Sequence, residues 1–189
     1  MSPNVLVIAG ASGSGKSTIV RHILRKYSGL FRASVSYTTR IPREREVNGV
    51  DYHFVTQEVF LRKVQAGEFV EHAEYAGNFY GTGKEYSCPG EEKVLLLEIE
   101  KKGVQSIKSS GMDAVYMYIY APMSVLHERI SQRAIITQDE LSRRLMKAKE
   151  ENMYGSTSEF DVLVENNLLE EALSKVDDFI ERTWKVQRA

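Results

Sequence analysis

The chain has 189 residues, of which 42% are hydrophobic and 27% charged, with a formal net charge of -1. This length suits one domain with its own core, and the near-neutral charge favours neither a nucleic-acid nor a membrane-surface partner. The single cysteine, Cys88, cannot form an internal disulfide, and no apolar run is long enough for a signal peptide or a membrane span. We therefore expect one cytoplasmic domain over residues 1–189.

Strand and helix patterns alternate along most of the chain. An aliphatic run at residues 5–9 predicts a strand that ends at glycines, and apolar residues at helical spacing up to Tyr27 predict a helix. Buried strands are also predicted at 94–97, 114–121 and 160–164. Helices are predicted after Pro122 as far as Arg129, over 139–154 with Asp139 as N-cap, and over 168–186 with one apolar face formed by Leu169, Leu173, Val176, Phe179 and Ile180.

These alternating elements predict an α/β fold with a central parallel sheet covered by helices on both faces. Residues 33–86 break the pattern, because short segments rich in Tyr, Arg, Thr and Gly replace the long apolar runs. We expect a small mixed α/β insertion there, and we expect function to concentrate in it.

A phosphate-binding loop follows the first predicted strand. Residues 10–18 have the sequence GASGSGKST, which satisfies GxxxxGK[ST] in full and opens a predicted helix. The glycines allow backbone N–H groups to point inward at phosphate oxygens, Lys16 adds a full charge, and the Ser17 hydroxyl is placed to ligate magnesium. The expected ATP-binding residues are Gly10, Ala11, Ser12, Gly13, Ser14, Gly15, Lys16, Ser17 and Thr18.

A cluster of Arg and Tyr residues in the insertion suggests an oxyanion clamp. Arg40 and Arg43 flank Pro42 and could bind a monophosphate with bidentate geometry, and Tyr52 and Tyr80 could add hydroxyl donors. Taken alone, residues 42–46 are better explained as a solvated charged loop.

Four segments together resemble the guanylate kinase family over nearly the whole chain. They are the phosphate loop, SVSYTTRIPREREVNGVDYHFV at 34–55, GEFVEHAEYAGNFYGT at 67–82, and the region 129–145. The resemblance implies a three-layer P-loop NTPase fold and transfer of the γ-phosphoryl group of ATP to GMP with Mg²⁺. It also implies a core of residues 1–32, 87–123 and 146–189, a GMP-binding region at 33–86 and a short helical lid at 124–145.

The same resemblance implies roles for individual residues. The GMP phosphate is expected on Arg40, Arg43, Tyr52 and Tyr80, and guanine is expected to face Ser36, Glu71, Thr82 and Glu100, with Glu46 in the same GMP-binding set. The chemistry agrees for Glu71, because a carboxylate accepts from both the N1–H and the 2-amino group of guanine, whereas adenine has a lone pair at N1.

The expected chemistry needs no general base, because the attacking phosphate oxygen of GMP is already anionic. Cations must instead stabilise the charge on the transferring group. The expected catalytic residues are Lys16, Arg40, Arg129, Arg133 and Arg144, of which the last three belong to the mobile lid by the resemblance. Magnesium is expected at Ser17 and, through water, at Glu98.

Several positions depart from the family pattern. Glu98 and Glu100 replace an Asp-x-Asp pair, and both the lid at 134–136 and the adenine side at 165–167 are altered. Two other functions stay open: a catalytically silent interaction module, and a kinase for another small acceptor such as a phosphorylated ribose. We expect a monomer or weak dimer, and the sequence identifies no protein partner.

Overall fold

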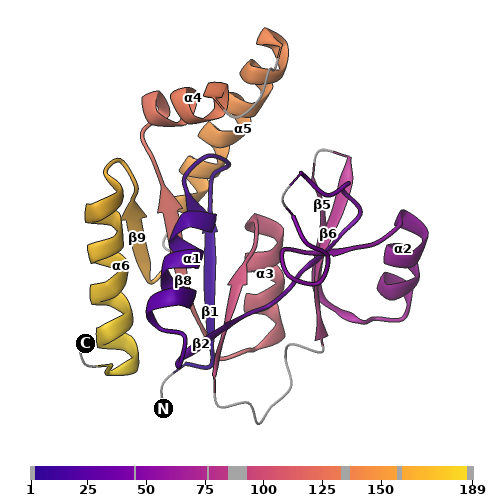
Figure 1. Ribbon diagram of the computed structural model, residues 1–189, viewed down its shortest axis with the longest axis horizontal. Coiled ribbons are helices and arrows are strands. Elements are labelled where there is room, and N and C mark those ends of the chain that lie inside the picture. The colour runs from indigo at the N-terminus through magenta and orange to yellow at the C-terminus, as the bar shows by residue number, and fades with distance from the viewer. Residues whose placement is uncertain are drawn as a thin grey trace.

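The computed structural model describes residues 3–44, 46–75, 77–84, 93–132, 137–156 and 159–186. A five-stranded sheet forms the centre, with the strand order β2-β7-β1-β8-β9 and every neighbouring pair parallel (Figure 1). Its strands are β1 (Val5–Gly10), β2 (Phe31–Ala33), β7 (Val94–Glu98), β8 (Ala114–Tyr120) and β9 (Val162–Glu165).

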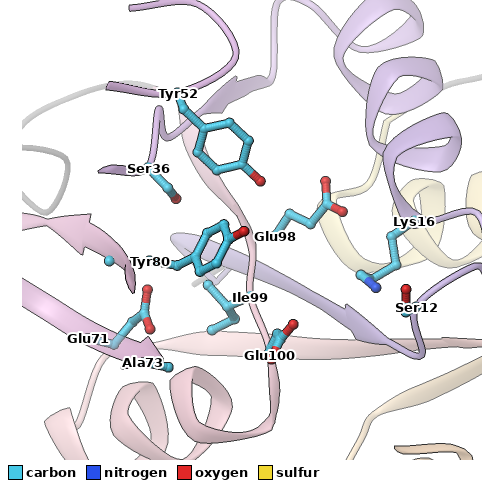
Figure 2. Close-up of a pocket in the computed structure, with 11 residues that line it drawn as sticks. Ser12, Lys16, Ser36, Tyr52, Glu71, Ala73, Tyr80, Glu98, Ile99 and Glu100 are labelled. Carbon is cyan, nitrogen blue, oxygen red and sulfur yellow. The ribbon is translucent and has the colours of Figure 1, made fainter. Parts of the chain in front are cut away.

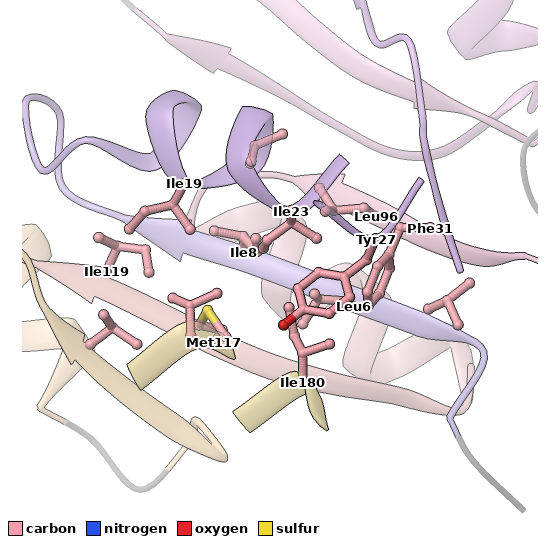
Figure 3. Packing of buried hydrophobic residues seen from close by; sticks show 14 of the residues in the cluster. Leu6, Ile8, Ile19, Ile23, Tyr27, Phe31, Leu96, Met117, Ile119 and Ile180 are labelled. Atoms are coloured by element: carbon pink, nitrogen blue, oxygen red, sulfur yellow. The ribbon is translucent and has the colours of Figure 1, made fainter. Parts of the chain in front are cut away.

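Helices cover both faces of this sheet because side chains along β1 alternate between two cores. Leu6 and Ile8 pack with α1 (Lys16–Lys26) and α6 (Leu169–Trp184), as Figure 3 shows for Ile19, Ile23 and Ile180. Val5, Val7 and Ala9 face the other way, in a cluster with residues of α3 (Lys101–Ser110) and α5 (Gln138–Gly155). The predicted α/β fold with a central parallel sheet and helices on both faces is confirmed.

A second sheet lies beside the core, with the order β4-β3-β6-β5 and mixed strand directions. Its strands are β3 (Tyr37–Thr38), β4 (His53–Phe54), β5 (Phe69–Tyr75) and β6 (Asn78–Gly83). Helix α2 (Gln57–Gln65) packs on it through Phe60, which is fully buried and stacks on Phe69 and Phe79 at ring-centroid distances of 4.6 and 5.5 Å. Of the predicted GMP-binding residues, the strands of this sheet carry Glu71, Tyr80 and Thr82.

Helix α4 (Met123–Gln132) follows β8 and packs beside α5. Leu126 and Ile130 of α4 are buried with Ala11 of the phosphate loop and Leu141 of α5. The predicted division into core, GMP-binding region and lid remains a prediction. Within the described ranges, no helix has both the length and the apolar character to cross a membrane.

Some local predictions were wrong. Thr137, not Asp139, is the N-cap of α5, because its hydroxyl accepts from the backbone N–H of Glu140 at 3.3 Å and the helix begins one residue earlier than expected. Leu169 is 42% exposed, since the buried face of α6 begins at Ala172. Outside the predicted insertion at 33–86, β2 and α3 were not predicted; inside it, a mixed α/β arrangement was expected without bounds for single elements.

Candidate active site

The phosphate loop has the geometry that its glycines allow. β1 ends at Gly10 and α1 begins at Lys16, with Gly13 and Gly15 in the left-handed region at φ 87° and 92°. A Cβ at Gly15 would lie 2.2 Å from Nδ2 of Asn166, so a larger residue at this position would clash as well as strain the backbone. The loop therefore keeps its curved backbone conformation at the amino end of α1. Backbone N–H groups and the helix dipole favour the binding of anions there.

Asn166 fixes this loop to the central sheet. The residue follows β9 and is 2% exposed, and its Nδ2 donates to the carbonyl oxygen of Ser14 at 2.7 Å. Its backbone N–H donates to the carbonyl oxygen of Tyr120 at 2.7 Å. Sequence reasoning noted Asn166 only as a departure near the adenine side and missed this contact, which joins segments 152 residues apart in the chain.

Lys16 lies over the loop that precedes it. Its Nζ donates to the carbonyl oxygens of Gly10 and Ala11 at 2.7 and 3.1 Å. In Figure 2 its ammonium lies beside Ser12 on one side of a pocket. The charge of Lys16 is thus placed at the mouth of the phosphate loop, as the motif predicts.

Ser17 and Glu98 meet at the carboxyl edge of the parallel sheet. The Ser17 hydroxyl donates to Glu98 Oε1 at 3.1 Å, and Glu98 ends β7 in register with Ile8 of β1. A hydroxyl and a carboxylate are hard oxygen donors of the kind that Mg²⁺ prefers beside nucleotide phosphates. In the described part of the chain, no cluster of three or more His, Cys, Asp or Glu side chains could hold a metal.

On the acceptor side, Glu71 and Thr82 form a buried pair across β5 and β6. They are 8% and 0% exposed, and the Thr82 hydroxyl donates to Glu71 Oε1 at 2.7 Å. Burial raises the pKa of Glu71, and the two hydrogen bonds from Thr82 oppose that shift. A carboxylate in this setting has few other partners, so a ligand with two adjacent N–H donors suits it.

Gly103 of α3 leaves room for this carboxylate. A Cβ at Gly103 would lie 2.9 Å from Glu71 Oε2 and 2.9 Å from the side chain of Ile99. Any other residue would therefore displace the carboxylate or the helix. Sequence reasoning missed Gly103, although a glycine inside a helix is unfavourable enough to be a signal of a close approach.

One pocket joins the donor and acceptor sides (Figure 2). Its lining contains much of the predicted set from both sides, and also three residues that were not predicted: Ala73, Gly81 and Ile99. The predicted residues that line it are Ser12, Lys16, Ser36, Tyr52, Glu71, Tyr80, Glu98 and Glu100. The phosphate loop, the end of β7 and the second sheet therefore face a common space.

Arg40 is oriented by Glu46 at the edge of the second sheet. Its Nη1 and Nη2 donate to the two carboxylate oxygens of Glu46 at 2.8 and 2.9 Å, and its guanidinium lies 5.4 Å from the ring centre of Tyr52. The hydrogen bonds from Arg40 hold the pKa of Glu46 below its usual range. The backbone N–H of Arg43 also donates to Glu46 at 2.7 Å, while the Arg43 side chain is exposed.

Tyr52 is placed to act as a neutral hydroxyl donor. Burial, reinforced by the charge of Glu98, raises the pKa of Tyr52 to about 12. Its ring meets that of Tyr80 edge to face, with centroids 6.1 Å apart. The two predicted phosphate-binding tyrosines therefore lie side by side.

The predicted lid arginines differ in their surroundings. Arg129 of α4 lies beside the phosphate loop, 4.0 Å from where a Gly15 Cβ would stand, and its buried Nη1 has no hydrogen-bond partner among the described residues. The side chain of Arg144 of α5 is 43% exposed and forms an ion pair with Glu140 on its own helix. Arg133 and residues 134–136 lie outside the described residues.

The chain is similar in sequence to a known family of proteins along almost its whole length. A family model described as guanylate kinase matches residues 2–183. The chain belongs to the guanylate kinase family. It is 40% identical over 176 residues to a guanylate kinase of Sus scrofa, covering 90% of this chain and 88% of that one, and 38% identical over 192 residues to one of Homo sapiens, covering 98% and 97%.

A solved structure extends the family likeness to three dimensions. The crystal structure of guanylate kinase from Anaplasma phagocytophilum superposes with a TM-score of 0.75 at 29% identity, over 96% of this chain and 86% of that chain. The resemblance noted in the four sequence segments is confirmed, and so is the P-loop NTPase fold of the guanylate kinase family. The roles of individual residues remain proposals.

Proposed function

We propose that this member of the guanylate kinase family transfers the γ-phosphoryl group of ATP to GMP, forming ADP and GDP. One observation carries the proposal: Ser12 and Lys16 of a complete phosphate loop line the same pocket as the buried Glu71, whose carboxylate accepts from the Thr82 hydroxyl. The loop accounts for binding of a triphosphate, and the pair accounts for selection of guanine. The proposed substrates are ATP and GMP, and dGMP is expected to replace GMP.

Guanine recognition rests on the buried carboxylate. The Thr82 hydroxyl donates to Oε1 of Glu71, and the same carboxylate lines the pocket, where its remaining lone pairs can accept from a ligand. Guanine presents N1–H and a 2-amino group, so it satisfies the carboxylate, whereas adenine leaves the same buried charge unpaired. Sites that reject a ligand in this way discriminate by about 10⁴-fold or more.

Phosphate recognition on the acceptor side is assigned to Arg40 and Arg43 with Tyr52 and Tyr80. We assign Glu46 an orienting role, because both of its carboxylate oxygens are occupied by Arg40. An arginine fixed in this way keeps its remaining N–H groups and its stacking on Tyr52, so little side-chain entropy is lost when an anion binds.

We assign the stabilisation of negative charge on the transferring phosphoryl group to four cations: Lys16, Arg129, Arg133 and Arg144. The ammonium of Lys16 and the unpartnered Nη1 of Arg129 both lie at the phosphate loop, and Arg144 would have to leave Glu140 to act there. Ser17 and Glu98 would hold Mg²⁺, which when bound would stabilise charge on phosphate oxygens. The chain itself contributes the positioning of the two substrates.

A coupled assay for ADP release tests the proposal, with ATP and Mg²⁺ and with GMP or AMP as acceptor. We expect turnover with GMP at least 100-fold above that with AMP. If ATP binds but neither GMP nor AMP supports ADP release, the proposal fails and a catalytically silent module is favoured. Turnover with a phosphorylated ribose but not with GMP would instead assign another acceptor.

A further inference from the structure

Lys147 of α5 lies between two carboxylates that belong to different parts of the site. Its Nζ is 4.0 Å from Glu100 Oε2 at the pocket wall and 4.0 Å from Glu151 Oε1 one helical turn further along α5. The other carboxylate oxygen of Glu151 accepts from the backbone N–H of Ser12 in the phosphate loop at 2.9 Å. A continuous series of contacts therefore joins the phosphate loop to the acceptor pocket through one lysine.

This part of α5 is held firmly on the central sheet. The Tyr118 hydroxyl donates to the backbone oxygen of Glu151, and Asn152 Nδ2 donates to the carbonyl oxygen of Ala121 at 2.9 Å. Gly155 lets the helix approach, because a Cβ there would lie 2.2 Å from the ring of Tyr118. The amino-terminal part of α5 extends beyond the sheet in Figure 1.

Among the described residues that line the pocket, carboxylates outnumber cations, and Lys147 adds a positive charge next to Glu100. Glu71, Glu98 and Glu100 all line the pocket, and among the described residues that line it Lys16 is the one cation. Lys16 Nζ already donates to two loop carbonyls. A second cation near Glu100 offsets the repulsion among these carboxylates.

We propose that Lys147 is a positioning and specificity residue for the acceptor, which holds the Glu100 carboxylate at the pocket wall and links it through Glu151 to the phosphate loop. This inference rests on the proposed function, because the ligand that benefits is GMP. Neither Lys147 nor Glu151 belongs to the residues that the family resemblance indicated.

The test compares Lys147→Met with Lys149→Met, which removes an exposed lysine two residues along the same helix. GMP affinity is measured by calorimetry, and KM and kcat are measured in the ADP-release assay. We expect the Kd and KM for GMP to rise about fivefold in Lys147→Met, the scale of a partly exposed ion pair, with the KM for ATP unchanged. Lys149→Met should match the unmodified chain, and Lys147→Arg should restore most of the GMP affinity.

A double-mutant cycle separates this role from general destabilisation. If Lys147 acts through Glu100, Lys147→Met should have no further effect on GMP affinity once Glu100→Gln is present. An equal loss in both backgrounds would contradict the proposal, and the melting temperatures of the variants would identify a folding defect.

Failure of this inference can be told apart from failure of the proposed function. If the unmodified chain binds no GMP, both fail. If the unmodified chain binds and phosphorylates GMP while Lys147→Met behaves like Lys149→Met, only the role of Lys147 is refuted.

Discussion

Glu71→Gln tests the proposed basis of guanine selection most directly. The substitution keeps the size of the side chain and replaces one carboxylate oxygen by an amide NH₂. Because the Thr82 hydroxyl donates to Oε1 at 2.7 Å, the amide oxygen should stay on Thr82, which turns the NH₂ toward the ligand. A donor then faces the N–H donors of guanine.

The expected loss of kcat/KM for GMP can be estimated from this replacement of one hydrogen-bond acceptor by one donor. Losing a hydrogen bond to a charged group costs about 1.5–3 kcal/mol, and leaving a buried donor unsatisfied costs about 1–3 kcal/mol. The sum of about 2.5–6 kcal/mol corresponds to a loss of about 10²- to 10⁴-fold in kcat/KM for GMP. AMP should gain slightly, because its N1 lone pair can accept from the new amide.

The measurement is kcat/KM for GMP and AMP by coupled ADP release. Glu74→Gln is the matched control, since Glu74 is exposed and its position in β5 places it on the opposite face of the strand from Glu71. We expect the control to keep the activity of the unmodified chain. If Glu71→Gln keeps its GMP activity within about threefold, the carboxylate does not recognise the base and the proposed specificity is wrong.

Three further predictions follow from the site. Gly103→Ala should raise the KM for GMP about tenfold, because its Cβ would lie 2.9 Å from Glu71 Oε2; an unchanged KM would mean that the carboxylate moves without cost. Lys16→Ala should lower kcat by about 10²-fold or more with an unchanged circular dichroism spectrum, and near-normal turnover would remove its electrostatic role. Burial raises the pKa of Glu71, so kcat/KM for GMP should fall as pH falls through that raised pKa, above the ordinary range near 4.3. A pH profile of Glu71→Gln that kept this limb would contradict the assignment. The same shift means that the free energy of unfolding should fall as pH rises from the unfolded glutamate value to the raised pKa, a trend that urea titrations of Glu71→Gln should lack.

The parts of the site that the sequence predicted are those encoded within a short segment. The phosphate loop needs only a strand, glycines at fixed spacing and a helix, so Lys16 and Ser17 could be placed before any tertiary contact was known. The apolar runs that became β1 and β8 were equally clear, because both faces of β1 and of the central part of β8 are buried.

The missed features depend on contacts between distant segments. Asn166 reaches Ser14, and Gly103 makes room for Glu71, and neither partner can be inferred from spacing along the chain. β2 has three residues, too few for a periodic pattern. Thr137 caps α5 although Asp139 was predicted, and because both residue types suit an N-cap, only the backbone geometry decides between them.

The segment from Glu98 to Gly103 ties the two sides of the site together. Glu98 meets Ser17 of the donor side, Glu100 is the N-cap residue of α3, and Gly103 lies against Glu71 of the acceptor side. The end of β7 and the first turn of α3 therefore set the positions of Glu98, Glu100 and Gly103 together. A backbone shift in this segment must change donor and acceptor binding together, whereas Arg43→Ala, on an exposed loop, should weaken GMP binding and leave ATP binding unchanged in titrations.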